Sequence, residues 1–319
     1  MTEAPLPVEP ARHRRPRVGY VMAATAATLW GVNGTVSKVI LASGISSLRL
    51  TQVRMTGGLI GFVLVLLLIA PERLRVRARE LPFLALFGIG GLVFVQWFYF
   101  LAIHRLAVGI ALLIEYVAPL LVALWARYVF HEPVRRRIWL ALALALVGLA
   151  LIVNVRHGGG HTASGISTTG VLFALLSAAA YTFYLLLAEH AVGDRDAVSL
   201  LAWGFGFGAL FWCFAAPWWS FPFGRVDADV SLLGHLSHHQ LPVWALMLFL
   251  VVIGTVVPFF LLVSALRHLS ATRVGIIAML EPVLATIVAW AWLKESLGAA
   301  QLVGAAVVLG AILLAQTAR

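Results

Sequence analysis

Two stretches of this chain decide its fold, because they repeat one pattern. Residues 102–132 read AIHRLAVGIALLIEYVAPLLVALWARYVFHE, and residues 265–295 read ALRHLSATRVGIIAMLEPVLATIVAWAWLKE. Aligned without a gap, they place Pro119 opposite Pro282 and end on the same Glu. Each stretch has a short basic turn, an apolar run, and a carboxylate within one turn of a proline in the middle of the run. This pattern indicates a duplicated membrane segment with an interrupted, acidic middle.

Composition places the chain in the membrane. It is 62% hydrophobic and 11% charged, with a mean hydropathy of +0.98, and about 20 apolar residues suffice to span a bilayer. We count ten runs of that kind, near residues 18–41, 45–70, 81–103, 106–129, 136–154, 168–190, 197–217, 241–266, 272–293 and 298–316. The sequence therefore predicts an all-α polytopic membrane protein with ten transmembrane helices.

The distribution of charge predicts the topology. A net charge of +10 would suggest a nucleic-acid partner in a soluble protein,. Here the basic clusters Arg12–Arg17, Arg73–Arg79 and Arg127–Arg137 all fall on one side of the membrane when the N-terminus is inside. This bias follows the positive-inside rule, so both termini are predicted to be cytoplasmic and no nucleic-acid partner is expected. Residues 1–17 are too polar for a signal peptide and are predicted to form a disordered cytoplasmic tail.

A change in composition divides the chain into two halves. Residues 155–167 are rich in Gly, Ser and Thr and are predicted to be a linker between repeats at 18–154 and 168–316. Each half holds five apolar runs, and an odd number means that the second half enters the membrane from the opposite side. The fold is therefore predicted to be two inverted five-helix repeats, with a central site near the membrane midplane between them.

The same motifs resemble a known family. The passages GIALLIEYVAPLLVALW…HEP and ATRVGIIAMLEPVLATIVAWAWLKE, with the early WGVNGTVSK, are similar to the paired EamA domains of the drug/metabolite transporter superfamily. The resemblance covers about residues 18–316, as two EamA-like five-helix repeats. It implies a ten-helix carrier of the bacterial inner membrane, often an exporter, without covalent chemistry. GIALLIEYVAPLLVAL is also loosely similar to the corresponding stretch of bacterial threonine/homoserine exporters.

Two acids and two prolines lie inside the apolar runs. A carboxylate is costly in hydrocarbon unless it faces a cavity or a partner, so Glu115 and Glu281 are candidate substrate-binding residues. Either could take up a proton in one state and release it in another, as proton exchange requires. Alternatively, Glu281 only bonds backbone groups freed by Pro282. Pro119 and Pro282 are candidate hinges, with a static kink as the alternative.

Polar and aromatic pairs spaced i, i+3 share a helix face and complete the predicted site. Such side chains would suit an amphipathic organic solute, although interhelical bonding and ordinary aromatic packing could also explain them. The pairs are Trp30 with Asn33, Gln96 with Tyr99, and Tyr181 with Tyr184.

Four further features of the sequence indicate a role or a position in the fold. Arg54 could bind a substrate carboxylate as a bidentate pair, or form a structural or gating pair with an acid of the protein. Lys38 is predicted to snorkel to the interface, and the single cysteine, Cys213, to lie in the core. The histidines of the long loop 218–240 are interpreted as solvated rather than as metal ligands.

These features predict a secondary active transporter of small organic metabolites, such as amino acids or related compounds. We expect an exporter that works by alternating access with protons as coupling ion, without catalytic residues, metal or cofactor. A drug or toxic-compound efflux carrier is the alternative within the same class. A polytopic membrane enzyme or a non-transporting membrane sensor is the alternative from another class. The oligomeric state stays open, with a homodimer considered.

Overall fold

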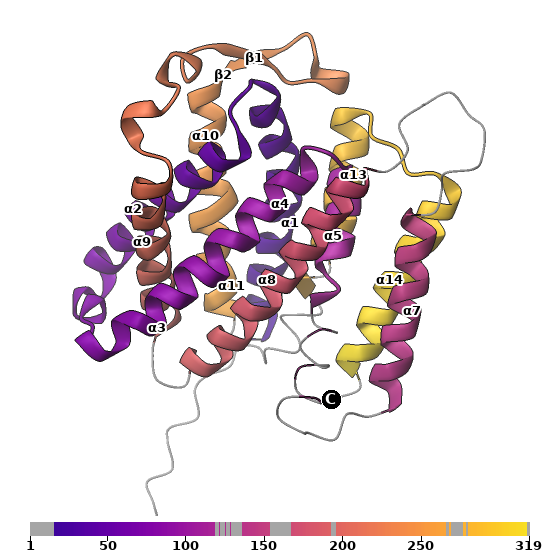
Figure 1. The fold of residues 1–319 in the computed structure, drawn as a ribbon, viewed down its shortest axis with the longest axis horizontal. Helices are drawn as coiled ribbons and strands as arrows, with labels where there is room; N and C mark the ends of the chain where they lie inside the picture. The colour runs from indigo at the N-terminus through magenta and orange to yellow at the C-terminus, as the bar shows by residue number, and fades with distance from the viewer. Residues whose placement is uncertain are drawn as a thin grey trace, which may run out of the picture.

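The computed structural model describes residues 16–118, 136–153, 167–192, 196–265 and 280–317, and single residues at 121, 125, 128, 268, 277 and 278. The predicted tail and linker therefore lie almost entirely outside the described residues. Described helices of the first half are α1 (Pro16–Ala42), α2 (Ser47–Ile69), η1 (Pro71–Leu74), η2 (Ala78–Glu80), α3 (Leu81–Ala85), η3 (Leu86–Val93), α4 (Phe94–Ile103), α5 (Val108–Glu115) and α7 (Arg136–Val153). Their order is shown in Figure 1.

The second half follows the same order of long helices. Its elements are α8 (Thr168–Val192), α9 (Ala197–Ala215), η4 (Trp218–Ser220), η5 (Phe223–Arg225), β1 (Asp229–Ser231), η6 (Gly234–Leu236), β2 (Gln240–Pro242), α10 (Val243–Val251), η7 (Val252–Val256), α11 (Val257–Ala265), α13 (Leu280–Leu293) and α14 (Ala299–Thr317). All ten predicted apolar runs contain helix among their described residues.

Helix length supports a membrane protein but does not establish ten spans. Within the described part of the chain, five helical segments are long and apolar enough to cross a bilayer: Ser47–Ile69, Ala78–Ile103, Thr168–Ala188, Val198–Ala215 and Val243–Leu262. Shorter apolar helices cover Trp139–Gly148, Leu280–Leu293 and Leu302–Ala311. The helical, membrane-spanning class is confirmed, while the count of ten and the inverted orientation stay predictions.

Helix packing is symmetric under exchange of the two halves. Helix α1 packs on α13 as α8 packs on α5, and α4 packs on α8 as α11 packs on α1. The pairs α2 with α9 and α7 with α14 map onto themselves. Figure 1 shows α7 and α14 side by side at one edge of the molecule. The pairing places the first four helices of each half around a shared centre.

The third helical run of each half contains a π-helical turn. One turn is η3, between α3 and α4, and the other is η7, between α10 and α11. In the repeat alignment Gly91 of η3 falls opposite Gly254 of η7. A π-turn leaves backbone groups out of the regular α-helical pattern and is frequent at functional sites. Both turns border the site described below.

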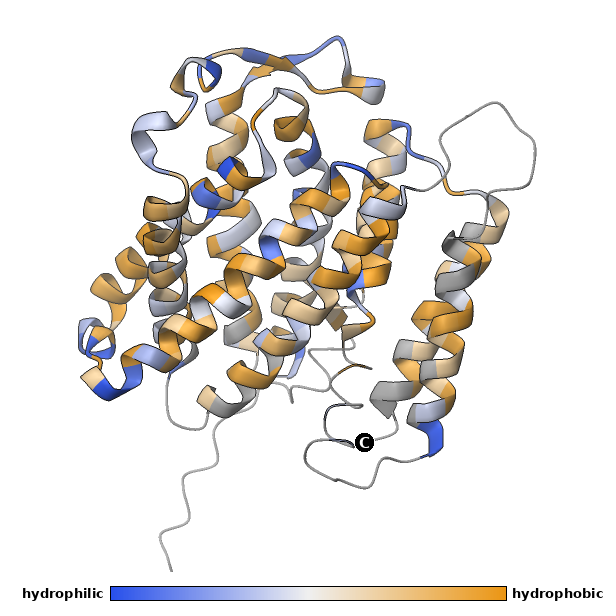
Figure 2. Cartoon of the chain, viewed as in Figure 1, coloured by the Kyte–Doolittle hydropathy of each residue, from blue (hydrophilic) through white to orange (hydrophobic). Residues whose placement is uncertain are grey.

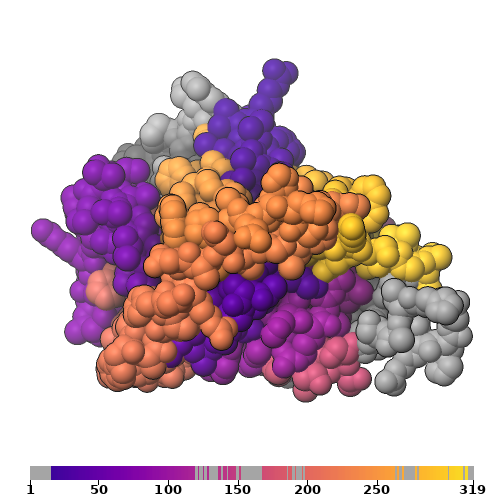
Figure 3. Space-filling view, turned by 90° about the horizontal axis from the view of Figure 1, so that it is seen from above, coloured from indigo at the N-terminus to yellow at the C-terminus, as the bar shows by residue number. Residues whose placement is uncertain are grey.

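The two ends of the bundle differ in structure. One end, here the hairpin end, carries β1 and β2, which pair antiparallel; the other, the arginine end, carries the turn 71–80 between α2 and α3. Figure 3 shows the orange segment of the hairpin across its end of the molecule, and Figure 2 shows hydrophilic residues gathered at the turn between α2 and α3. The loop 218–240 is anchored on the bundle, because Phe221, Val230 and Leu232 are buried in the main core. Its histidines are exposed, as predicted from the sequence.

Candidate functional site

All nine residues predicted to bind substrate line one cavity of about 240 Å³. They reach it from six helices of both halves, two each from α1, α4 and α8 and one each from α2, α5 and α13. The structure establishes this convergence, and a role in binding stays a prediction. The nine residues are Trp30, Asn33, Arg54, Gln96, Tyr99, Glu115, Tyr181, Tyr184 and Glu281.

Glu115 is the last residue of α5 and is buried, with 9% of its surface exposed. Its Oε2 lies 2.5 Å from Ser177 Oγ of α8, and that hydroxyl also lies 3.0 Å from the carbonyl oxygen of Val95. A serine hydroxyl has one proton to donate. An ionised Glu115 can therefore accept from Ser177, whereas a protonated Glu115 can donate to Ser177, which then donates to Val95. Both protonation states have hydrogen-bond partners.

Glu281, in the first turn of α13, has a matching arrangement. Tyr116 OH donates to Glu281 Oε2 at 2.8 Å and lies 3.1 Å from the carbonyl oxygen of Ala278. One hydroxyl thus faces two acceptors, and it can turn to Ala278 when Glu281 carries a proton. The hydroxyl that serves each acid belongs to the opposite half of the chain: Ser177 serves Glu115, and Tyr116 serves Glu281. The acids therefore link the two halves.

Four buried polar atoms of the cavity have no hydrogen-bond partner within the described part of the chain. They are Trp30 Nε1, Asn33 Oδ1, and both Nε2 and Oε1 of Gln96. Buried polar groups are nearly always paired with protein or water, so atoms of this kind at a cavity indicate a place for a polar ligand. The amide of Gln96 can donate and accept at once.

Arg54 is buried and is held by the π-turn of the other half. Its Nε donates to Thr255 Oγ1 at 2.9 Å, and its Nη2 to the carbonyl oxygen of Gly254 at 3.2 Å. No carboxylate pairs with it among the residues that the structure describes. A guanidinium has five N–H groups, and two of them are used here. The remaining donors of Arg54 are available to a ligand.

The second half supplies a more apolar wall. Trp30 packs edge-on against Phe259 with ring centroids 5.1 Å apart, and Tyr181 stacks on Tyr184 at 5.9 Å. Phe259 also lines the cavity, as does Leu262. In the repeat alignment these two fall opposite Gln96 and Tyr99, so the halves are equivalent in position but different in polarity.

Sequence reasoning missed several residues at the site. Ser177, Tyr116, Phe259 and Leu262 were not selected, although the last two could have been found by carrying the repeat offset from Gln96 and Tyr99. Ser177 and Tyr116 gave no such signal, because an uncharged hydroxyl is tolerated at many places in a helix bundle.

The two predicted hinges have different outcomes. Pro119 lies outside the described residues; the described helix α5 ends four residues before it, at Glu115. Pro282 lies in the first turn of α13, which begins at Leu280. Residues 277 and 278, just before α13, are also helical, and Pro282 has no N–H to donate to the carbonyl oxygen of Ala278. The hydroxyl of Tyr116 lies 3.1 Å from that oxygen. The hinge therefore stays a prediction for both residues.

Lys38 does not snorkel freely as predicted. It forms an ion pair with Glu295, which follows α13, and its Nζ donates to the carbonyl oxygen of Leu106 at 2.9 Å. The second oxygen of Glu295 accepts from the backbone N–H of Val108 at 3.1 Å. This contact, here the Lys38–Glu295 clasp, ties α1 and the start of α5 to the second half at the hairpin end. The prediction failed because it considered the depth of Lys38 and not the acid that packs beside it.

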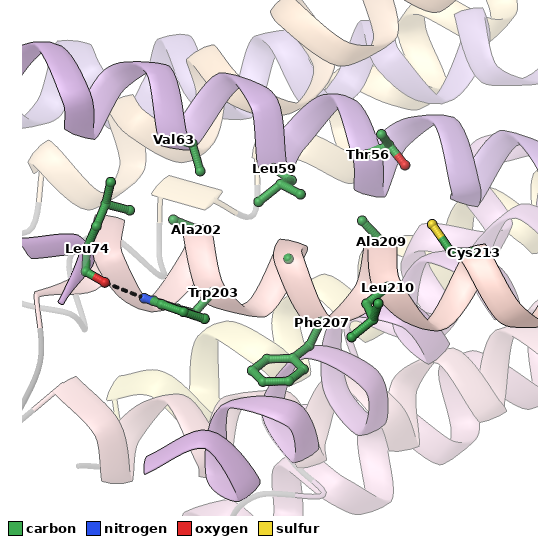
Figure 4. A pocket seen from close by; sticks show the side chains of 11 residues that line it. Thr56, Leu59, Val63, Leu74, Ala202, Trp203, Phe207, Ala209, Leu210 and Cys213 are labelled. Carbon is green, nitrogen blue, oxygen red and sulfur yellow. Dashed lines mark hydrogen bonds between the residues drawn. The ribbon is translucent and has the colours of Figure 1, made fainter. Parts of the chain in front are cut away.

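A larger cavity of about 460 Å³ lies between α2 and α9 and is almost wholly apolar. Figure 4 shows it as a groove along both helices, with Cys213 at one end and Leu74 at the other. Cys213 is exposed, so its predicted core position is wrong. The reason is that this face of α9 borders the groove and not the centre of the bundle. Lacking charged groups, the groove is not the candidate substrate site.

Comparison with known proteins supports a transporter. The model of the EamA-like transporter family matches residues 17–154 and again residues 168–317. The chain is 28% identical to an uncharacterized transporter of Archaeoglobus fulgidus, over 88% of this chain and 91% of that protein. It is also 28% identical to the threonine/homoserine exporter RhtA of Escherichia coli strain K12, over 86% and 80% respectively. One crystal structure matches with a TM-score of 0.57 and 20% identity over 93% of this chain and 96% of that one, a likeness of fold alone.

Proposed function

The chain belongs to the EamA-like transporter family, and on that premise we propose that it exports a small zwitterionic metabolite, an amino acid or a related compound, by alternating access. One observation carries this proposal: a cavity that six helices of both halves enclose holds two acids, a guanidinium and four polar atoms that have no hydrogen-bond partner among the described residues. The RhtA relatives are threonine/homoserine exporters, which agrees with that chemistry.

The polar groups of the cavity match the two charged ends of an amino acid. The free N–H groups of Arg54 suit a carboxylate, and the carboxylates of Glu115 and Glu281 suit an ammonium group. Trp30 Nε1 and the Gln96 amide can then bond the polar part of a side chain. The aromatic rings of Tyr181, Tyr184 and Phe259 offer an apolar surface to the remainder.

The size of the cavity favours one of the two transport alternatives. Pockets for drug-sized ligands measure about 300–1,000 Å³, and this cavity measures about 240 Å³. A small metabolite therefore fits better than a multi-ring drug. The aromatic wall is the observation that favours the efflux alternative, and a growth-inhibition panel of amphipathic drugs with and without the gene tests it.

Proton exchange is the coupling that the site supports best. Each acid faces a hydroxyl that can donate to it or accept from it, with a carbonyl as second acceptor, so each acid keeps a hydrogen-bond partner whether it is protonated or ionised. Because each hydroxyl comes from the opposite half, protonation also changes a contact between halves. Alternating access requires such a link between an ion site and the relative position of the repeats.

The orientation follows from the positive-inside rule. We place the arginine end in the cytoplasm and the hairpin end outside, in the bacterial inner membrane. The Lys38–Glu295 clasp and the buried core beneath the hairpin then close the outer side in this structure, with the two five-helix halves rocking about the cavity during transport.

A comparison of metabolite pools tests the proposal. Intracellular and external amino acids are measured with and without expression of the gene, and again with Glu115→Gln. Asp227→Asn serves as control, because it makes the same carboxylate-to-amide change on an exposed residue of the hairpin segment. We expect efflux to be lost in Glu115→Gln at normal membrane abundance and retained in Asp227→Asn. Unchanged efflux in Glu115→Gln would remove the cavity from the mechanism.

A further inference from the structure

Helix α9 carries two adjoining hollows, and neither belongs to the central cavity. The first is the apolar groove of Figure 4, which runs beside α2 from Leu74 and Ala202 to Thr56 and Cys213. From residue 202 to residue 213 it follows α9 for about 16 Å, at 1.5 Å per residue,. Its dimensions suit an extended hydrocarbon chain that lies along the helices.

The second hollow lies beside the first, at the arginine end. It measures about 880 Å³ and has the four arginines Arg73, Arg75, Arg77 and Arg79 in its lining, with Glu80 and Asp196 as the acids. Apolar side chains also line it, namely Val76, Phe83, Leu84, Ala191 and Leu200.

The two hollows share one stripe of α9. Ser199 borders the basic hollow, whereas Trp203, Gly206 and Leu210 border the groove, and their spacing of three or four residues puts them on one helix face. Along the turn between α2 and α3, Arg73 borders the basic hollow and the next residue borders the groove. The hollows therefore adjoin along one face of α9, the first apolar along the helices and the second basic at the arginine end.

The turn that presents the arginines is fixed on α9. Trp203 Nε1 donates to the carbonyl oxygen of Leu74 at 3.1 Å, and Ser199 Oγ donates to that of Arg73 at 2.6 Å. Arg73 also pairs with Asp196 at 2.9 Å. Leu74 and Val76 pack on the core between α2 and α9, which leaves the alternate residues, the arginines, on the outer side.

Charge and depth point to the occupant. Among the described residues, only Arg73 of the four arginines has an ion-pair partner. The turn follows directly on Leu68 and Ile69 of α2, whose side chains are 85% and 69% exposed, as expected of residues that face lipid. The arginines therefore stand at the level of the phospholipid headgroups, where basic residues attract anionic lipids.

We propose that the two hollows form one binding site for an anionic phospholipid, with an acyl chain in the apolar groove and the phosphate against Arg75 and Arg77. The walls come from both halves of the chain, the turn after α2 on one side and α9 on the other. A bound lipid thus bridges the two halves. The site is separate from the central cavity, and it does not depend on the transported substrate.

Lipid titration of the purified full-length protein in detergent, read by native mass spectrometry, tests the site. The probes are phosphatidylglycerol, phosphatidylcholine with the same chains, and inorganic phosphate. We expect phosphatidylglycerol to bind about tenfold or more tightly than phosphatidylcholine. Arg75→Gln/Arg77→Gln should abolish that preference, and Arg136→Gln/Arg137→Gln, which removes two exposed arginines at the start of α7, should keep it.

A second variant separates the groove from the charge. Gly206→Leu would fill the apolar groove beside Leu59 and leave every arginine in place. We expect it to weaken phosphatidylglycerol binding severalfold while its unfolding temperature stays near that of the wild type. Equal binding of the two lipids, equal loss in both double variants, or competition by millimolar inorganic phosphate as effective as lipid would overturn the proposal.

Discussion

Removal of the Lys38 ammonium should open the hairpin end of the bundle. In this structure the Lys38–Glu295 clasp joins the first half to the second, with Leu106 O and the Val108 N–H as further partners. Lys38→Met deletes the charge and two hydrogen bonds and keeps a side chain of similar length. Glu295 then retains its bond from Val108 but loses its counter-charge.

The exposure of the pair sets the size of the effect. The side chains are 26% and 17% exposed, which lies between a surface pair, worth about 0–1 kcal/mol, and a buried pair, whose disruption costs about 3–5 kcal/mol. We therefore expect Lys38→Met to destabilise the closed state by about 1–3 kcal/mol. Since about 1.4 kcal/mol is tenfold in an equilibrium constant, the open population should rise by a factor of about 5–150.

Cysteine labelling from outside the cell measures this shift. Cys213→Ser removes the native thiol, and Gln96→Cys places a single thiol at the cavity. We expect the labelling rate with a membrane-impermeant maleimide to rise about tenfold when Lys38→Met is added. Lys294→Met removes an exposed ammonium next to the clasp and should leave the rate unchanged. An equal rate in Lys38→Met and Lys294→Met would refute the clasp as the outer closure.

Two further substitutions address contacts around the cavity. An added Cβ at Gly254 would overlap Asn33 Oδ1, so Gly254→Ala should lower transport severalfold at normal abundance. The control Gly310→Ala adds its Cβ in open space and should leave transport intact. Equal activity of the two variants would contradict the role of the close approach between Gly254 and Asn33. Tyr116→Phe removes the hydroxyl that donates to Glu281 and should lower the free energy of unfolding by about 1–3 kcal/mol. Thermal unfolding in detergent measures this change. An unchanged melting temperature would show that the hydrogen bond contributes nothing to stability.

The sequence was sufficient to locate the cavity but not its hydrogen bonds. Polar residues within apolar runs are costly unless they face a partner or a cavity, and this rule selected Glu115 in the fourth run and Glu281 in the ninth. Ser177 and Tyr116 escaped it, because hydroxyl groups carry no comparable cost and their partners depend on how the helices pack.

The main failure of the sequence-based predictions concerned contacts between segments that are far apart in the chain. The clasp joins residues that are far apart in sequence, and depth alone predicted a snorkelling Lys38. The strands of the hairpin are three residues each, too short for a periodicity to be visible. The π-turns at Gly91 and Gly254 also could not be recognised from the sequence of either half alone, although the repeat alignment places these two glycines opposite each other.

Proton exchange through Glu115 is the central claim, and transport in proteoliposomes tests it most directly. Efflux of labelled threonine is measured with and without an imposed pH gradient, for the wild type and for Glu115→Gln. The mechanism predicts that the gradient accelerates wild-type efflux severalfold, and that Glu115→Gln loses this response but still exchanges labelled for unlabelled substrate. Wild-type efflux of a transported substrate at the same rate with and without the pH gradient would contradict proton exchange.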